Sequence, residues 1–275
     1  MELDIKFLKQ IAIKVFEAVN PLLGTKAAAM KTTRGAGGDI SMKIDIIAEN
    51  VIIDSLKEAS IDILLISEEI GEIYVGDPAI AKKSQNKIIV DPLDGSNNAV
   101  RGVPYSSVSI AYAIGDKIRD IKKAVVLNLN TKDIYWAEKG RGAYFNDIPI
   151  QVSDFDISQK CFFELNLPMN NLMENLQKLT PLIRRFYRIR ILGSSALTLC
   201  QIAGGGMEAF INLRESNRLV DVAAGMLILT EAGGEIFSLN GDIIDKDLSI
   251  NTKFPFIACN NNLVSFLKKE LVLKQ

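Results

Sequence analysis

Histidine is absent from this chain of 275 residues. Its absence excludes Ser-His-Asp and Cys-His catalysis, and it also excludes a zinc site built on imidazole. The three cysteines show no CxxC spacing, and we predict buried thiols at Cys161, Cys200 and Cys259. A disulfide between Cys161 and Cys200 stays open, because the sequence does not supply the geometry that such a bond requires.

An excess of charge of one sign and long apolar runs are lacking too. The net charge is −1, from 32 basic and 33 acidic residues, so there is no bulk field to gather nucleic acid or an anionic membrane. No apolar run has the length of a membrane span, and the N-terminal sequence MELDIKFLKQ lacks the pattern of a signal peptide. We therefore expect a cytoplasmic globular protein without nucleic-acid or membrane partners.

Residues 91–104, DPLDGSNNAVRGVP, gather most of the chemistry that the sequence offers. The β-branched apolar run before them, 87–90, predicts a buried strand, and Pro92 directs the backbone as it leaves that strand. Asp94 and Gly95 are a common hairpin turn, yet no matching alternation of apolar and polar residues flanks them. Two carboxylates at a strand end, followed by a glycine, therefore favour a divalent metal that holds a phosphate.

Carboxylates also stand at the ends of other predicted elements. The apolar run 61–66 predicts a second strand, and Glu68 follows it. Asp45 precedes an amphipathic helical pattern, and Asp221 is predicted at the start of a helix over residues 219–232. A carboxylate at a helix start also suits the helix dipole or a capping role, so each of these positions has a structural explanation as well.

The rest of the chain alternates helical and strand patterns. Residues 3–23 show helical spacing, and residues 108–150 predict antiparallel strands. The glycine-rich segment 31–39 predicts a plain loop or a mobile active-site loop. Residues 184–193 alternate arginines with apolar residues, which suits a solvated face or a strand that presents its basic side to an anion. These patterns predict a mixed α/β (α+β) fold.

Four ordered stretches make the chain similar to the inositol monophosphatase superfamily, which includes fructose-1,6-bisphosphatases and nucleotide phosphatases. DPLDGSNN resembles the family signature, and GDISMKIDIIAE, LLISEE and VDVAAGMLILTEAGG stand in the family's order. The resemblance implies a layered αβαβα sandwich and a single phosphatase domain over residues 1–275. Within it, an α+β portion at about 1–150 and an α/β portion at about 151–275 would hold the metal site between them.

The resemblance further implies which residues bind metal. Glu68, Asp91 and the Leu93 carbonyl would hold one Mg²⁺, and Asp91, Asp94 and Asp221 a second, with Asp91 bridging. A third, weaker ion is expected near Glu68 and the loop before Asp45, and Mn²⁺ is a possible substitute, since oxygen ligands select hard cations.

Hydrolysis would proceed by direct attack of water. The implied catalytic residues are Asp45, Ser96 and Glu68, with Asp45 hydrogen-bonded to the Ser96 hydroxyl so that it orients and deprotonates the water. The chain departs from the family pattern at Ser96, where threonine is usual, and at residues 219–220, where many relatives have tryptophan.

A small phosphorylated sugar or polyol is the implied substrate. Arg214 replaces an acidic residue of inositol-selective relatives, which makes the pocket more cationic than one phosphate needs. We therefore expect the dual fructose-1,6-bisphosphatase/inositol-1-monophosphatase type, with the sugar bisphosphate preferred. The substrate-binding residues would be Gly95, Ser96, Asn97, Arg101, Arg185, Arg188, Ser195 and Arg214.

Two alternatives accompany this interpretation. A 3'-phosphoadenosine 5'-phosphate phosphatase would need adenine stacking, and the aromatic content is only 7%. A non-catalytic, partner-binding protein of the same fold would be favoured by lost acidic positions, and all are present. The resemblance also implies a homodimer or dimer of dimers that acts in carbohydrate metabolism, in gluconeogenesis.

Overall fold

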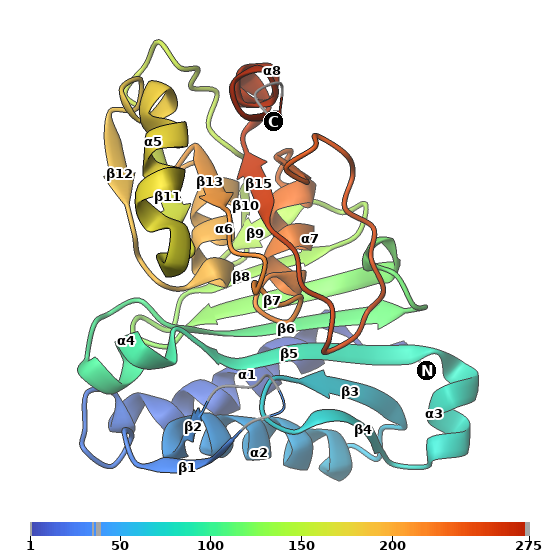
Figure 1. The fold of residues 1–275 in the computed structure, drawn as a ribbon. Helices are drawn as coiled ribbons and strands as arrows, with labels where there is room; N and C mark the ends of the chain where they lie inside the picture. The colour runs from blue at the N-terminus through green and yellow to red at the C-terminus, as the bar shows by residue number, and fades with distance from the viewer. Residues whose placement is uncertain (1, 35, 37–39, 273–275) are drawn as a thin grey trace.

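Helices and sheets alternate in layers through the protein (Figure 1). The structure, a computed structural model, describes residues 2–34, 36 and 40–272. Within them an eight-stranded and a five-stranded sheet are covered and separated by helices, with a small two-stranded ribbon at one side. The predicted αβαβα sandwich is confirmed.

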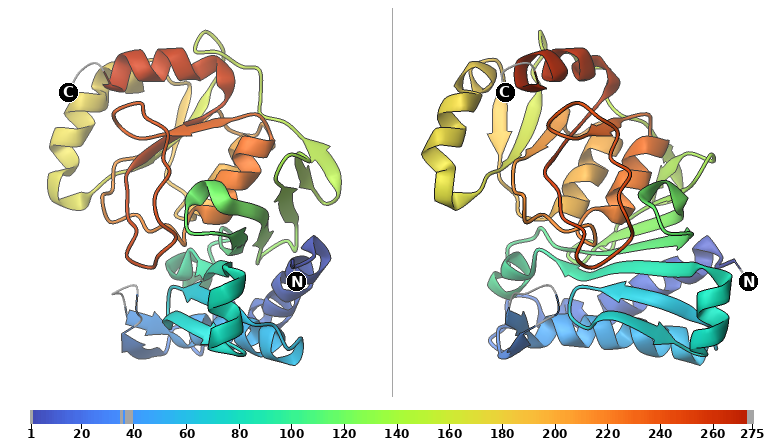
Figure 2. Two further views of the ribbon diagram at one scale, coloured as in Figure 1. Left: turned by 90° about the vertical axis from the view of Figure 1, so that its right-hand side faces the viewer. Right: turned by 45° about the vertical axis from the view of Figure 1, so that its right-hand side comes forward.

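The first helical layer consists of α1 (Ile5–Val19) and α2 (Lys43–Glu58). The apolar stripe of α1 is buried, and the Asp4 side chain caps its first turn by accepting a hydrogen bond from the Lys6 N–H at 3.1 Å. A 3-10 turn, Asn20–Leu22, follows α1. Both helices pack on one face of the eight-stranded sheet, which Figure 2 shows from two further sides.

The eight-stranded sheet has the order β10-β9-β8-β7-β6-β5-β3-β4, and only the β3/β5 pair is parallel. A short helix, α3 (Pro78–Ser84), connects β4 to β5. The strands are β3 (Ile63–Ser67), β4 (Gly71–Val75), β5 (Asn86–Asp94), β6 (Ser107–Ile114), β7 (Ile121–Asn128), β8 (Ile134–Glu138), β9 (Ala143–Phe145) and β10 (Ile148–Ile150). The antiparallel sheet predicted over 108–150 is thereby confirmed.

Alternation along the strands assigns side chains to the two faces. In β5, Ile88 and Val90 pack toward α1 and α2, whereas Ile89 packs toward the middle helical layer. That layer consists of α6 (Ser195–Ala203) and α7 (Ala223–Glu231). Both helices are apolar on nearly all sides because they are buried between two sheets.

The five-stranded sheet has the order β12-β11-β13-β15-β14. Its outer face is covered by α5 (Leu172–Ile183) and by α8 (Val264–Leu267), which continues as a π-helix, Lys268–Val272. The strands are β11 (Phe162–Asn166), β12 (Arg188–Arg190), β13 (Ala209–Asn212), β14 (Glu235–Phe237) and β15 (Phe256–Cys259). Further 3-10 turns span Ile118–Asp120, Met169–Asn171 and Asn261–Leu263.

Several sequence-based predictions need correction. Lys31–Arg34 forms a strand, β1, that pairs with β2 (Ile40–Met42), so this part of the predicted loop is wrong. Residues 35 and 37–39 of that loop lie outside the described residues. The arginine-rich segment is a strand only at Arg188–Arg190, because Arg184 caps the end of α5.

Two open points of the sequence are also resolved. All three cysteines are buried and free, so Cys161 and Cys200 are not bridged. Asp94 and Gly95 do not form a hairpin turn, because Gly95 caps a short helix, α4 (Ser96–Arg101). In the part of the chain that the structure describes, no helix is long and apolar enough to cross a membrane.

Candidate metal centre and active site

Two neighbouring strands deliver acidic residues to the same edge of the eight-stranded sheet. In the parallel pair β3/β5, Ser67 lies opposite Val90, so the next residues, Glu68 and Asp91, are neighbours. Strand β5 continues past Val90 to Asp94, with a register shift between Asp91 and Asp94 in its pairing with β6. The sequence predicts that the backbone leaves the strand at Asp91, and this is wrong, because Asp91 lies on an irregular stretch of β5.

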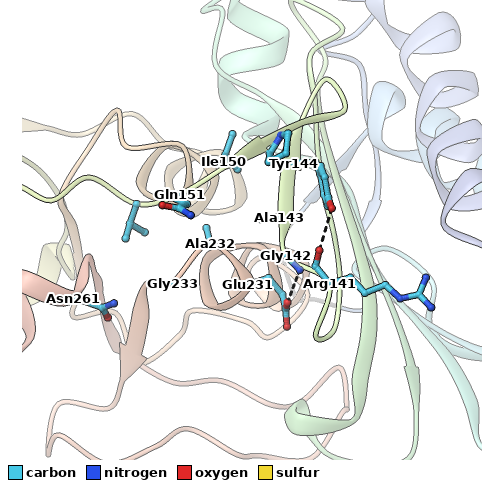
Figure 3. A pocket seen from close by; sticks show the side chains of 12 residues that line it. Arg141, Gly142, Ala143, Tyr144, Ile150, Gln151, Glu231, Ala232, Gly233 and Asn261 are labelled. Atoms are coloured by element: carbon cyan, nitrogen blue, oxygen red, sulfur yellow. Dashed lines mark hydrogen bonds between the residues drawn. The ribbon is translucent and has the colours of Figure 1, made fainter.

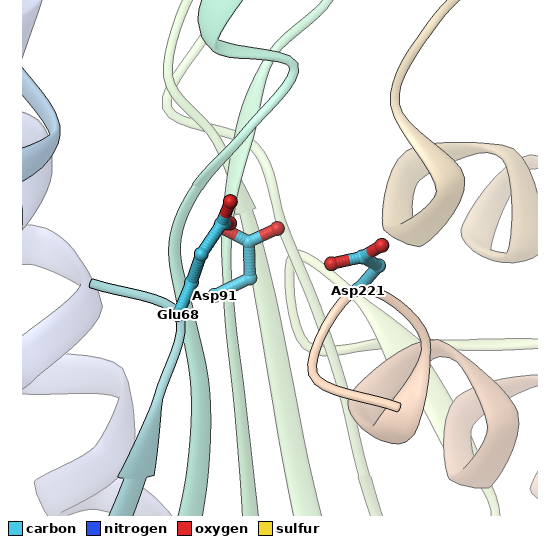
Figure 4. A group of neighbouring side chains, drawn as sticks. All are labelled: Glu68, Asp91 and Asp221. Carbon is cyan, nitrogen blue, oxygen red and sulfur yellow. The ribbon is translucent and has the colours of Figure 1, made fainter. Parts of the chain in front are cut away.

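Asp221 approaches this pair from the other half of the molecule. It lies in the turn before α7, whose N-cap is Val222, so it is not the helix start that the sequence predicted. One carboxylate oxygen from each of Glu68, Asp91 and Asp221 lies within 4.8 Å of the others. Figure 4 shows Asp221 facing the carboxylates of Glu68 and Asp91 across the site.

Burial makes this arrangement electrostatically costly. It raises the pKa of Glu68 to about 8, and the nearby Asp221 charge adds to the effect. The pKa of Asp91, which is 1% exposed, is also raised by burial and by the charges of Glu68 and Asp94. Crowded carboxylates with only oxygen donors suit a hard divalent cation, so these residues fit the metal that the sequence implied.

Arg218 supplies the positive charge among these carboxylates, and the sequence analysis missed it. Its Nη1 lies 2.5 Å from Glu68 Oε1, and its Nε lies 3.1 Å from Asp221 Oδ1. These opposite charges raise the pKa of Arg218 further, despite its burial. The only sequence signal was a basic residue three positions before Asp221.

Asp94 lies beside the acidic cluster and accepts hydrogen bonds from residues at the start of α6. Its Oδ2 accepts hydrogen bonds from the Ser194 hydroxyl and from the Ala196 N–H, both at 2.7 Å. The Ser195 N–H also stabilises the charged form, yet burial raises the pKa of Asp94 to about 7. Asp94 thus joins β5 to the start of α6.

The predicted pair of Asp45 and Ser96 is present. The Ser96 hydroxyl donates to Asp45 Oδ1 at 2.8 Å, and it also lies 2.9 Å from the Leu93 carbonyl oxygen. Asp45 is held from its other side, since its Oδ2 accepts from the Met42 N–H at 2.7 Å. Burial raises the pKa of Asp45, whereas these hydrogen bonds lower it.

A buried glutamate shapes the turn that carries Glu68. Glu49, on α2, accepts hydrogen bonds from the Ser67 hydroxyl at 2.5 Å and from the Ile70 N–H at 3.0 Å. The Ser41 hydroxyl donates to the carboxylate of Glu69 in the same turn. The backbone on both sides of Glu68 is therefore fixed by side chains from other elements.

Gly95 and Asn98 shape the loop after β5. Gly95 has φ +89°, and a Cβ there would lie 3.0 Å from the Tyr105 carbonyl oxygen, so glycine is required. The Asn98 side chain donates to the carbonyl oxygens of Tyr105 and Leu192, at 2.8 and 2.7 Å. Asn98, which the sequence analysis did not select, ties α4 to the segment that enters α6.

The predicted substrate-binding residues are distributed over several surfaces. Asn97 and Arg101 are exposed on α4. Burial raises the pKa of Asp221, and the charge of exposed Arg214 is one of the effects that oppose this rise. Arg185 stacks on the ring of Phe266, with 4.7 Å between its Cζ and the ring centroid. Arg188 stacks on Tyr187 at 4.3 Å. Their contacts with a substrate stay a prediction.

Two surface pockets are lined by other residues. One of about 370 Å³ lies between the β8–β9 turn and the end of α7 (Figure 3). There Glu231 accepts hydrogen bonds from the Gly140 and Gly142 N–H groups at 2.8 and 2.9 Å. Another of about 410 Å³ is lined by Lys117 and residues of the segment 245–253. Neither includes the acidic cluster.

Residues 1–269 match the inositol monophosphatase family. The chain belongs to this family. A fructose-1,6-bisphosphatase/inositol-1-monophosphatase of Methanothermobacter thermautotrophicus is 34% identical over 274 residues, which cover 94% of each chain. A bifunctional NADP phosphatase/NAD kinase of Methanococcus maripaludis is 35% identical over 95% of this chain, but the chain spans only about half (47%) of that relative.

Solved structures of the family have the same fold. An inositol monophosphatase–fructose 1,6-bisphosphatase superposes with a TM-score of 0.84 at 26% identity, with 99% of each chain covered. The extragenic suppressor protein suhB of Bartonella henselae gives a TM-score of 0.83 at 28% identity and 98% coverage of each chain. The resemblance seen in the sequence is confirmed.

Proposed function

We propose that this protein is a metal-dependent phosphate monoester hydrolase that acts on fructose-1,6-bisphosphate, inositol monophosphate or both. The observation that carries the proposal is the convergence of Glu68, Asp91 and Asp221, whose carboxylate oxygens lie within 4.8 Å of one another. Membership of the inositol monophosphatase family and the relatives named for these two activities support the same reaction.

The metal is proposed to be Mg²⁺, with Mn²⁺ as a substitute and two or three ions in the site. Glu68, Asp91 and the Leu93 carbonyl would hold one ion, and Asp91, Asp94 and Asp221 another. When bound, such ions lower the pKa of water and stabilise the negative charge of the leaving oxygen. The arrangement of the carboxylates on three separate elements suits ions that join both halves of the molecule.

The chain's own residues orient the attacking water and the phosphate. Asp45 is proposed as the general base, because a raised pKa suits proton uptake and the Ser96 hydroxyl fixes its direction. The N–H groups of Gly95 and Ser96 would bind phosphate oxygens, since a glycine at this position allows close approach to the backbone. Glu68 is proposed to act with Asp45 in positioning the water.

Arginines would decide between substrates. Arg214 and Arg101 are exposed, Arg185 lies in the turn after α5, and Arg188 begins β12 of the five-stranded sheet. We propose that these arginines bind a second phosphate of a sugar bisphosphate. Asn97 and Ser195 would complete the substrate site. In this proposal residues 1–275 form one phosphatase domain, and the protein acts in cytoplasmic carbohydrate metabolism as a homodimer or dimer of dimers.

A phosphorylated nucleotide is the second candidate substrate. The rings of Phe162 and Tyr187 are stacked with 5.8 Å between their centroids, and Arg190 lies over Phe162 at 4.8 Å. Arg188 lies over Tyr187 at 4.3 Å, so other side chains already cover both rings. The support for this candidate comes from the relative named a bifunctional NADP phosphatase/NAD kinase.

Phosphate release tests the proposal. Purified protein would be incubated with Mg²⁺ and fructose-1,6-bisphosphate, inositol-1-phosphate, NADP or 3'-phosphoadenosine 5'-phosphate, with Asp91→Asn as the control. We expect the sugar bisphosphate to be hydrolysed fastest and Asp91→Asn to be inactive. Release from a nucleotide alone would change the substrate assignment, and no release with Mg²⁺ or Mn²⁺ would favour a non-catalytic binding protein.

A further inference from the structure

Arg218 pairs with two of the three carboxylates that are proposed to bind a cation. Its guanidinium pairs with Glu68 at 2.5 Å and with Asp221 at 3.1 Å, and its side chain is only 15% exposed. Glu68 and Asp221 are two of the three residues whose carboxylate oxygens converge. A divalent ion coordinated by the same oxygens would lie within a few ångströms of this positive charge, and like charges at such separation repel strongly.

The backbone of Arg218 is fixed while its side chain spans the site. Arg218 forms an isolated β-bridge with Lys253, and the Leu219 N–H donates to the Thr252 carbonyl oxygen at 2.9 Å. The Arg218 N–H lies 3.3 Å from Asp221 Oδ2, so this residue is also anchored to Asp221 through its own main chain. If Arg218 moves when the site changes, we therefore expect its long side chain to move rather than its backbone.

We propose that Arg218 is an internal counterion that competes with the metal ion for Glu68. In the metal-free protein its charge offsets that of the buried carboxylates. Metal binding breaks the Nη1 contact with Glu68, while the Nε end stays near Asp221. Arg218 thereby stabilises the metal-free fold and lowers the affinity for metal. The proposal rests on the proposed metal site, and it concerns a residue to which no metal ligation is assigned.

A role for Arg218 in orienting Asp221 predicts the opposite change in metal affinity. If Arg218 served only to orient Asp221, its removal would leave Asp221 poorly placed and would weaken metal binding. If it competes with the ion, its removal strengthens metal binding and destabilises the metal-free protein. The sign of the change in affinity therefore separates the two roles, and it does not depend on catalytic activity.

The experiment measures Mn²⁺ binding to metal-free protein by calorimetry and by electron paramagnetic resonance of free Mn²⁺. The variants are Arg218→Met, whose side chain is uncharged and of similar length, and Arg218→Lys, whose side chain keeps the positive charge. Arg214→Met is the matched control, because it removes an exposed arginine of the same loop. Asp91→Asn identifies the site that is measured.

Arg218→Met is expected to bind Mn²⁺ at least about tenfold more tightly than the unaltered protein, because a buried like charge is gone. Arg218→Lys should stay within about threefold, and Arg214→Met should change less than Arg218→Met because solvent screens its charge. The melting temperature of metal-free Arg218→Met should fall, and saturating Mn²⁺ should remove most of the deficit. Arg218→Gln gives the same test if Arg218→Met does not fold.

Two results would overturn the inference in distinguishable ways. If Asp91→Asn abolishes binding but Arg218→Met and Arg218→Gln bind Mn²⁺ equally or more weakly, Arg218 is no competitor, while the metal site stands. If the unaltered protein and every variant fail to bind Mn²⁺, the proposed metal site is wrong, and the inference fails with it.

Discussion

Replacing Ser96 by alanine tests the proposed base most sharply. The Ser96 hydroxyl donates to Asp45 at 2.8 Å, and a hydrogen bond to a charged group contributes about 1.5–3 kcal/mol. Asp45 keeps its bond from the Met42 N–H, so it stays in place but loses the group that fixes its direction. We expect kcat to fall about 10- to 100-fold in Ser96→Ala, the equivalent of that hydrogen bond, which is less than the roughly 10²- to 10⁴-fold contribution of a positioned base because Asp45 itself remains.

The pH dependence gives a second readout of the same variant. The Ser96 hydrogen bond lowers the pKa of Asp45, so its loss raises that pKa. More of the base is then protonated at a given pH, and the acidic limb of the kcat profile moves to higher pH.

Ser96→Thr is the matched control, because it keeps the hydroxyl and restricts its rotamer. It should retain activity and an unshifted profile. A Ser96→Ala enzyme with unchanged kcat and an unshifted acidic limb would refute the role of this pair.

The other predictions concern stability. Glu68 and Asp94 have pKa values of about 8 and 7 in the folded protein, above their ordinary values of 4.5 and 3.8, so the folded state holds protons that the unfolded chain has lost. Metal-free stability should therefore fall as pH rises from about 5 to 8, by up to about 1.4 kcal/mol for each unit of pKa shift. Urea unfolding in chelator should show this fall, Mg²⁺ should reduce it, and stability constant over this range would contradict the burial argument. Gly95→Ala should lose about 1–3 kcal/mol, measured by the same unfolding, because φ +89° and the contact with the Tyr105 carbonyl disfavour a Cβ. Glu164→Leu should lose about 1–3 kcal/mol in urea unfolding, because the Leu192 N–H at 3.0 Å would lose its acceptor and the Thr198 hydroxyl at 2.6 Å would keep only the Ser194 carbonyl oxygen at 2.9 Å. An unchanged free energy of unfolding in either variant would contradict its reasoning.

Local patterns predicted the elements that carry the site. The apolar runs before Glu68 and Asp91 are strands, and their parallel pairing brings both carboxylates to one edge. The continuous apolar run of β5 is buried on both faces of the sheet, since Ile88 and Ile89 point to opposite sides. The layered architecture came from the family resemblance, because helical and strand periods do not specify which helix covers which sheet.

Features that depend on distant contacts were not predictable. Arg218 pairs with Glu68 across 150 positions of sequence, and no local pattern indicates such a pair. Asp221 was expected to begin a helix, yet it lies in the preceding turn because Val222 is the N-cap. Lys31–Arg34 looked like a loop because of the adjacent glycines, but pairing with β2 makes it a strand.

The proposed function depends on a metal site formed by Glu68, Asp91 and Asp221. An anomalous difference map from crystals grown with Mn²⁺ would show this site. We predict a strong peak at about 2.0–2.3 Å from oxygens of these carboxylates, with Arg218 withdrawn from Glu68. A map without a peak there, or with Arg218 still paired to Glu68 and Mn²⁺ bound only elsewhere, would contradict it.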